Sequence, residues 1–194
     1  MTTYRLRQME IDDKVCEQIN LKLVEHIYPK EVIERCLQQS GWWGQKQRRI
    51  RQTTVVSLVW LLIAMALWSR LNQSQVWQKL VGHLRTLHPL PQQGKLSDSG
   101  ISGRRQELGS EPLQGLFKEC CVVLSQPGQP GAFFGRYRIM AIDGTVFRTA
   151  DTPANEQAFG RSHNQFGKGA FPQVRAVLLA ECATHAVVGL ELSR

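Results

Sequence analysis

The sequence has few cysteines and no motif that would pair them. Five cysteines among 194 residues include one adjacent pair and no C-x-x-C spacing. An odd count without metal-ligand spacing argues against a disulfide framework or a zinc site, and it favours a reducing compartment. The opening residues, MTTYRLRQMEIDD, are polar and mixed in charge, unlike a secretory signal. We therefore expect a cytoplasmic protein with buried thiols.

Long hydrophobic runs are also missing. The most apolar segment covers residues 55–68, whereas a membrane-spanning helix needs about 20 apolar residues. We therefore expect no membrane partner, and we predict a buried core helix over this segment. Thr53 or Thr54 stands at its start and is suited to cap it.

Acidic residues are scarce in one region of the chain. Residues 41–105 hold ten Lys or Arg and a single acid, Asp98, whereas residues 139–194 hold five of each kind. The formal net charge of +8 therefore lies before residue 139. A concentrated basic region favours a polyanionic partner, most often nucleic acid. The alternative is a basic surface that only keeps the protein soluble.

Four cations gather in a short connector, GWWGQKQRRIRQTT, just before the apolar helix. Such a cluster releases counterions when it meets a phosphate backbone, so we predict a DNA-contacting arm. An ordinary solvated charge run is the alternative. The four residues are Lys46, Arg48, Arg49 and Arg51.

Several helices are predicted around this connector. The apolar spacing indicates helices over residues 15–27 and 30–40, and Ser74 is a candidate cap for a helix after the apolar one. A short helix then begins near Ser97 or Ser99 and stops at Gly109. Its small polar residues and arginines resemble a helix-turn-helix reading element, although surface helices of this composition are common. The residues concerned are Ser99, Ser102, Arg104 and Arg105.

The pattern changes from helical to strand-like after the linker SQPGQPGAFFG. Strands are predicted in RYRIMAID, FPQVRAVLLAECAT and HAVVGLEL, the last two forming a hairpin. The residues between the first two strands are rich in Gly and Pro, which favours a long loop. Glu181 and Glu191 fall on the last two strands, and we interpret them as surface or sheet-edge residues.

Asp143 most needs an explanation. In IMAIDGTVF it follows four apolar residues, which predicts a position near the end of a buried strand. A buried carboxylate is costly unless it is paired, hydrogen-bonded or bound to a metal. Three interpretations of Asp143 are open. Because Asp-Gly is a common hairpin-turn dipeptide, Asp143 could belong to a turn. It could also cap a loop with its carboxylate, or bind a metal ion that takes part in phosphoryl transfer.

Several segments together resemble the insertion sequence four family of bacterial DDE transposases. AIDGTVFRTADTPANEQAFGR and AFPQVRAVLLAECATHAVV resemble the start of the catalytic domain, while RQELGSEPLQGLF and TTVVSLVWLLIAMALW resemble the helical N-terminal domain. The resemblance implies a mainly α, DNA-binding domain over residues 1–130. Residues 131–194 would then form the first strands of an RNase H-like α/β domain with a mixed sheet. Asp143 would be the first catalytic, metal-binding carboxylate, and Mg²⁺ the cofactor.

The resemblance covers only part of the family's active site. The family's two further acids, an Asp on a later strand and a Glu on a helix, have no match before Arg194. We therefore expect a truncated transposase of the bacterial cytoplasm and nucleoid that binds double-stranded DNA at transposon ends but does not cut it. Copies of the chain could also associate with one another. The alternatives are a binding module that inhibits transposition and an inactive gene remnant.

Overall fold

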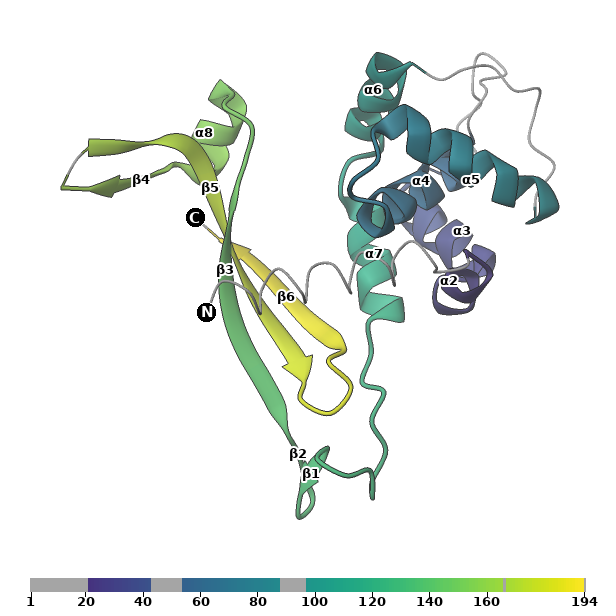
Figure 1. Cartoon of the computed structure of the whole chain (residues 1–194), viewed down its shortest axis with the longest axis vertical. Helices are drawn as coiled ribbons and strands as arrows, with labels where there is room; N and C mark the ends of the chain where they lie inside the picture. The colour runs from purple at the N-terminus through teal and green to yellow at the C-terminus, as the bar shows by residue number, and fades with distance from the viewer. Residues whose placement is uncertain (1–20, 43–53, 88–96, 166, 194) are drawn as a thin grey trace. The chain divides into compact units, whose positions relative to one another are not determined.

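The chain divides into two compact units, residues 1–120 and residues 121–194 (Figure 1). The computed structural model describes residues 21–42, 54–87, 97–165 and 167–193. The second unit includes the Gly- and Pro-rich segment that we interpreted as a linker. The two units are described separately below.

The described part of the first unit is helical throughout. Helix α3 packs against α7, and α4 packs against α5. The helices are α2 (Leu21–Ile27), α3 (Lys30–Gln39), α4 (Val55–Leu67), α5 (Gln73–Leu87), α6 (Asp98–Leu108) and α7 (Glu111–Cys120).

The apolar helix α4 forms the centre of this unit, which confirms the predicted core helix. Leu61 and Ala64 are completely buried, and Trp60 is 1% exposed. A helix that is hydrophobic on every side is stable only when protein surrounds it. Thr54 caps its start, because its hydroxyl accepts a hydrogen bond from the backbone N–H of Ser57 at 3.1 Å. Among the described residues, no helix is long and apolar enough to cross a membrane.

The ends of α3 and α6 are tied together. Gly41 adopts a positive φ of 75° after α3, a conformation that glycine tolerates best. The next residue, Trp42, donates its indole N–H to the carbonyl of Leu108 at the end of α6, at 3.1 Å. Ser97 caps the start of α6 and Gly109 follows its end, both as predicted.

The prediction that Ser74 caps α5 is wrong. Asn72 accepts a hydrogen bond from the backbone N–H of Gln75 at 2.9 Å, and the Gln75 side chain accepts one from Asn72 N–H. This reciprocal pair satisfies two donors at the helix start. Ser74 instead donates to the Asp98 carboxylate at 2.7 Å, which joins the starts of α5 and α6.

The second unit is built around one long strand, β5. This strand pairs with β3, β4 and β6, and the described pairs are all antiparallel. The β5–β6 hairpin confirms the predicted one. The elements are β1 (Phe133–Phe134), β2 (Tyr137–Arg138), β3 (Met140–Arg148), α8 (Pro153–Phe159), β4 (Arg161–Asn164), β5 (Gly167–Glu181) and β6 (Val187–Ser193).

The prediction of a long loop between the first two strands is wrong. This segment holds a helix, α8, and a strand, β4. Thr152 caps α8 from its hydroxyl, Pro153 occupies the first turn, and Gly160 ends the helix with a φ of 72°. The Gly and Pro residues therefore mark the boundaries of elements here.

Candidate functional site

Asp143 lies in the middle of β3. Its main chain pairs with Leu178 of β5, and the pairing continues through Gly144 to Arg148. Asp-Gly therefore forms no hairpin turn, and the predicted position near the end of a buried strand is also wrong. The Asp143 side chain is exposed, and one carboxylate oxygen accepts the backbone N–H of Gly144 at 2.8 Å.

The surroundings of Asp143 on the sheet are apolar. Directly opposed residues of antiparallel strands share a face, so Asp143, Leu178 and Leu190 form one row across β3, β5 and β6. Phe147 lies on the same face of β3 and is 54% exposed, while Leu190 is 44% exposed. Asp143 is thus a carboxylate within a largely hydrophobic surface.

The carboxylate of Asp143 has the hard oxygen donors that Mg²⁺ prefers. Among the described residues, however, no group of three His, Cys, Asp or Glu side chains is arranged to hold a metal ion. Asp143 therefore fits the chemistry of a magnesium ligand, and it would be one of the several ligands that such a site requires.

The predicted arm lies outside the described residues. This applies to Lys46, Arg48, Arg49 and Arg51, which all fall within residues 43–53.

Helix α6 divides its predicted DNA-contacting residues between two environments. Ser99 and Arg105 are exposed, and Arg105 lines a groove of about 450 Å³ together with Ser102. Leu62 of α4 and Leu113 of α7 also line this groove. The structure therefore brings Ser102 and Arg105 together on an open surface.

Arg104 is turned into the fold instead. Its side chain is 12% exposed and forms an ion pair of 2.9 Å with Glu107, one turn further along α6. Its Nε and Nη2 atoms are buried without a hydrogen-bond partner in the described part of the chain. Arg104 would have to leave this position before it could contact DNA.

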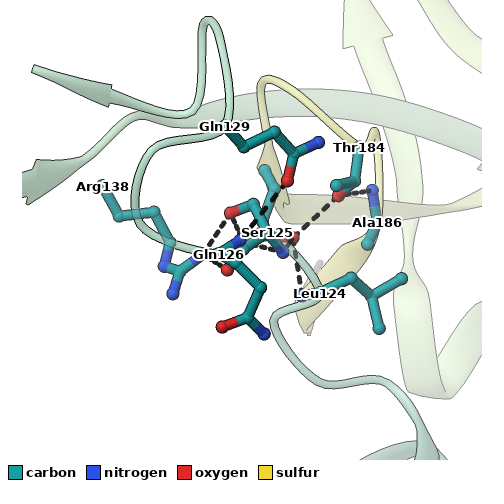
Figure 2. A network of polar contacts seen from close by, with 8 residues as sticks. Leu124, Ser125, Gln126, Gln129, Arg138, Thr184 and Ala186 are labelled. Carbon is teal, nitrogen blue, oxygen red and sulfur yellow. Dashed lines mark hydrogen bonds and ion pairs between the residues drawn. The ribbon is translucent and has the colours of Figure 1, made fainter.

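Glu181 is not the surface or edge residue that the sequence suggested. It is 1% exposed and accepts hydrogen bonds from Ser125 Oγ at 2.6 Å and Thr184 Oγ1 at 2.7 Å. The backbone N–H of Leu124 donates at 2.8 Å, and Arg138 forms an ion pair of 2.5 Å (Figure 2). The interpretation failed because three of these donors, Leu124, Ser125 and Arg138, lie in or beside the segment that we interpreted as a linker, far from Glu181 in the sequence. Glu191, by contrast, is exposed as expected.

The Glu181 network keeps this carboxylate ionised. Burial raises the pKa of Glu181, but the hydrogen bonds from Ser125, Thr184 and the backbone outweigh burial and lower the pKa to about 2. At neutral pH the carboxylate is therefore charged and holds residues 124–125 against the end of β5.

A second charged cluster lies around α8. Arg161 of β4 forms ion pairs with Asp151 and with Glu156, the latter at 3.1 Å. Lys168 of β5 also pairs with Glu156. The hydrogen bonds from Lys168 and then Arg161 lower the pKa of Glu156. Asp151 and Glu156 therefore pair with neighbouring cations.

The described part of the first unit is helical, and the second is an antiparallel sheet with the exposed carboxylate of Asp143 on β3. Residues 18–118 match the family described as insertion element 4 transposase N-terminal. The chain belongs to this family of transposases, and the resemblance predicted from the sequence is confirmed.

Two curated relatives are similar to most of the chain. Transposase InsG for insertion sequence element IS4 of Escherichia coli K12 is 30% identical over 155 residues, which covers 80% of this chain and 33% of InsG. Putative transposase InsZ of the same organism is 25% identical over 167 residues, covering 83% of this chain and 50% of InsZ. The chain thus spans a third to a half of these relatives. No solved structure matches it.

Proposed function

We propose that the chain is the DNA-binding front part of a transposase that recognises the double-stranded ends of its insertion element. The observation that carries this proposal is the family match over residues 18–118, the same region that concentrates ten basic residues and one acid in 41–105. Lys and Arg clusters of this kind gain affinity by releasing counterions from DNA. We assign DNA binding to residues 1–130.

We further propose that residues 131–194 are the first strands of an RNase H-like catalytic domain, with Asp143 as its first metal ligand. The apolar face around Asp143 supports this proposal. If further protein covers that face, the carboxylate needs a compensating cation. Bound Mg²⁺ ions in such a site activate a water and stabilise the leaving oxygen. Strand β3 would hold the Asp143 carboxylate in place for them.

Within the DNA-binding part, we propose separate roles for the arm and α6. Lys46, Arg48, Arg49 and Arg51 contact phosphates, which fixes position without reading sequence. Ser102 and Arg105 line the open groove, where they reach base edges. By itself the chain would occupy DNA ends without cutting them.

Binding to duplex DNA tests this proposal. We expect the affinity of the full chain to fall by orders of magnitude between about 50 mM and 200 mM salt, as fluorescence anisotropy would measure. The variant in which Arg48, Arg49 and Arg51 are all changed to Ala should bind more weakly and show a shallower salt dependence. Binding that is absent at low salt, or unchanged by salt, would contradict the proposal.

A further inference from the structure

The hairpin formed by β1 and β2 exposes two aromatic rings side by side. Phe134 is 81% exposed and Tyr137 is 64% exposed. These residues pair across the hairpin, so their side chains share one face. Gly135 begins the turn between them with a φ of 60°, which suits a tight two-residue turn. Most of the surface of these two side chains is therefore accessible to a ligand.

The opposite face of the hairpin is anchored. Phe133 lies under the Arg138 guanidinium, whose central carbon is 4.8 Å from the ring centre. Arg138 also donates to the carbonyl of Ser125 at 2.7 Å and pairs with buried Glu181 (Figure 2). This network fixes the base of the hairpin. The outward rings are therefore presented in a defined position.

The charge at the tip points to a polyanionic ligand. Arg136 lies over the Tyr137 ring, 5.1 Å from its centre, and donates to the Tyr137 hydroxyl at 3.0 Å. The sequence from residue 120 to residue 142 contains Arg136 and Arg138 but no Asp or Glu. An anionic ligand would meet no carboxylate from this segment, and Arg136 would be ready to contact a phosphate.

We propose that Phe134, Arg136 and Tyr137 form a stacking platform for an unpaired nucleotide of DNA. The base lies on the aromatic rings and its phosphate contacts Arg136. A base inside a duplex has both faces covered by its neighbours, whereas an unpaired base offers a free face to a ring. The tip carries no Asn, Gln, Asp or Glu to read a base edge, so recognition by stacking fits it better than base readout in a groove.

The position of this platform along the chain links it to Asp143. Tyr137 precedes Asp143 by six residues, so their Cα atoms are at most about 22 Å apart. An unpaired strand end on the hairpin would thus lie within a few nucleotides of a phosphate at the carboxylate. The inference rests on the proposed function, because it requires DNA to be the ligand of this chain.

The test compares two DNA probes with the full chain. One is a blunt duplex, and the other is the same duplex with a short single-stranded overhang that contains the fluorescent base 2-aminopurine. We expect the overhang probe to bind about tenfold more tightly. We also expect binding to quench 2-aminopurine, because stacking on an aromatic ring quenches its emission.

Matched variants assign the effect to the hairpin. Phe134→Ala combined with Tyr137→Ala should remove both the overhang preference and the quenching, while affinity for the blunt duplex stays the same. Phe134→Trp combined with Tyr137→Trp should keep the overhang preference and the quenching, because the stacking rings remain aromatic. Phe171→Ala serves as the control, because Phe171 is also an exposed aromatic of this unit, at 44% exposure. It should leave both readouts unchanged.

Three results would overturn the inference. The first is equal affinity of the parent chain for the two probes. The second is an alanine variant that loses affinity for both probes equally. The third is a variant whose sedimentation changes while its overhang preference persists, which would make the tip a protein contact. A chain that binds neither probe would refute the proposed function as well, whereas binding without overhang preference refutes the platform only.

Discussion

Glu181 links three segments that lie far apart in the sequence. Its carboxylate receives hydrogen bonds from residues 124–125, from Thr184 after β5, and from Arg138 of the hairpin. A buried carboxylate is stable only with such compensation, so removing these donors would destabilise the fold. The network therefore holds the start of the second unit, the hairpin and the β5–β6 turn in one arrangement.

The low pKa of Glu181 predicts acid sensitivity of the second unit. Its pKa falls from 4.5 to about 2 on folding. Ionised Glu181 therefore adds stability that is fully present above pH 4.5 and is lost as pH falls through about 2. We expect hydrogen–deuterium exchange of residues 171–193, corrected for intrinsic rates, to lose protection across this window.

Two substitutions separate Glu181 from the other acids of the sheet. Glu181→Gln should lower hydrogen-exchange protection already at neutral pH. It should also make protection depend less on pH between pH 4.5 and 2. Glu191→Gln, at an exposed position of β6, should behave as the parent chain does. Equal behaviour of the two variants would show that the buried network contributes nothing to stability.

The residues that the sequence misjudged depend on contacts across long separations. Glu181 and Ser125 are 56 positions apart, and no local pattern connects a strand residue with a Gly- and Pro-rich segment. We predicted Asp143 near a strand end because it follows four apolar residues, and Gly144 after it is a residue that weakens strands. In the fold, β5 continues the pairing past Gly144, so tertiary structure overrides the local preference.

At the scale of elements, local chemistry predicted the helices well. Thr54, Ser97 and Gly109 mark helix ends in the sequence and also in the structure. The same kinds of residue stand at the two ends of α8, where Thr152 precedes the helix and Gly160 follows it. We predicted a loop there because the segment is rich in Gly and Pro, and the seven residues of α8 are too few to show a clear apolar period against that composition.

The two arginines of α6 should differ when each is replaced by Ala. Arg105→Ala removes an exposed side chain of the groove and should relax base preference at one position by about 1–3 kcal/mol, with unchanged thermal stability. Arg104→Ala removes a mostly buried side chain and should lower the melting temperature instead.

Binding-site selection from a random duplex library, together with thermal melting, would compare these variants. If Arg105→Ala weakens binding to all sequences equally, Arg105 contacts phosphate rather than bases. If Arg104→Ala relaxes base preference while stability stays the same, the buried position of Arg104 does not describe the DNA-bound protein.

At the scale of the whole molecule, the chain combines a helical unit of the transposase family with a sheet that carries the exposed carboxylate of Asp143. The residues themselves predicted the basic region and the two kinds of secondary structure. The sequence did not predict which acids lie near Asp143 in space, because the ligands of a metal site come from strands and helices that are distant in sequence. The described acids near α8 pair with Arg161 and Lys168 instead.

We expect the 194-residue chain to leave DNA uncut. Two-metal phosphoryl transfer needs ions roughly 3.5–4 Å apart, held by several carboxylates. Incubation with supercoiled DNA and Mg²⁺ or Mn²⁺ should give no nicks above background, and Asp143→Ala should behave identically. Nicking by the parent chain that Asp143→Ala abolishes would show that a complete site assembles, for example with a second copy of the chain.

We propose that this chain recognises the ends of an insertion element. The most direct measurement is the ratio of dissociation constants of the full chain for a duplex with the terminal sequence of its own element and for a scrambled duplex. At about 150 mM salt we predict that the terminal duplex binds at least tenfold more tightly, since specific DNA-binding proteins exceed their non-specific affinity by far more than this. Equal affinities for the two duplexes would contradict recognition of the element's ends.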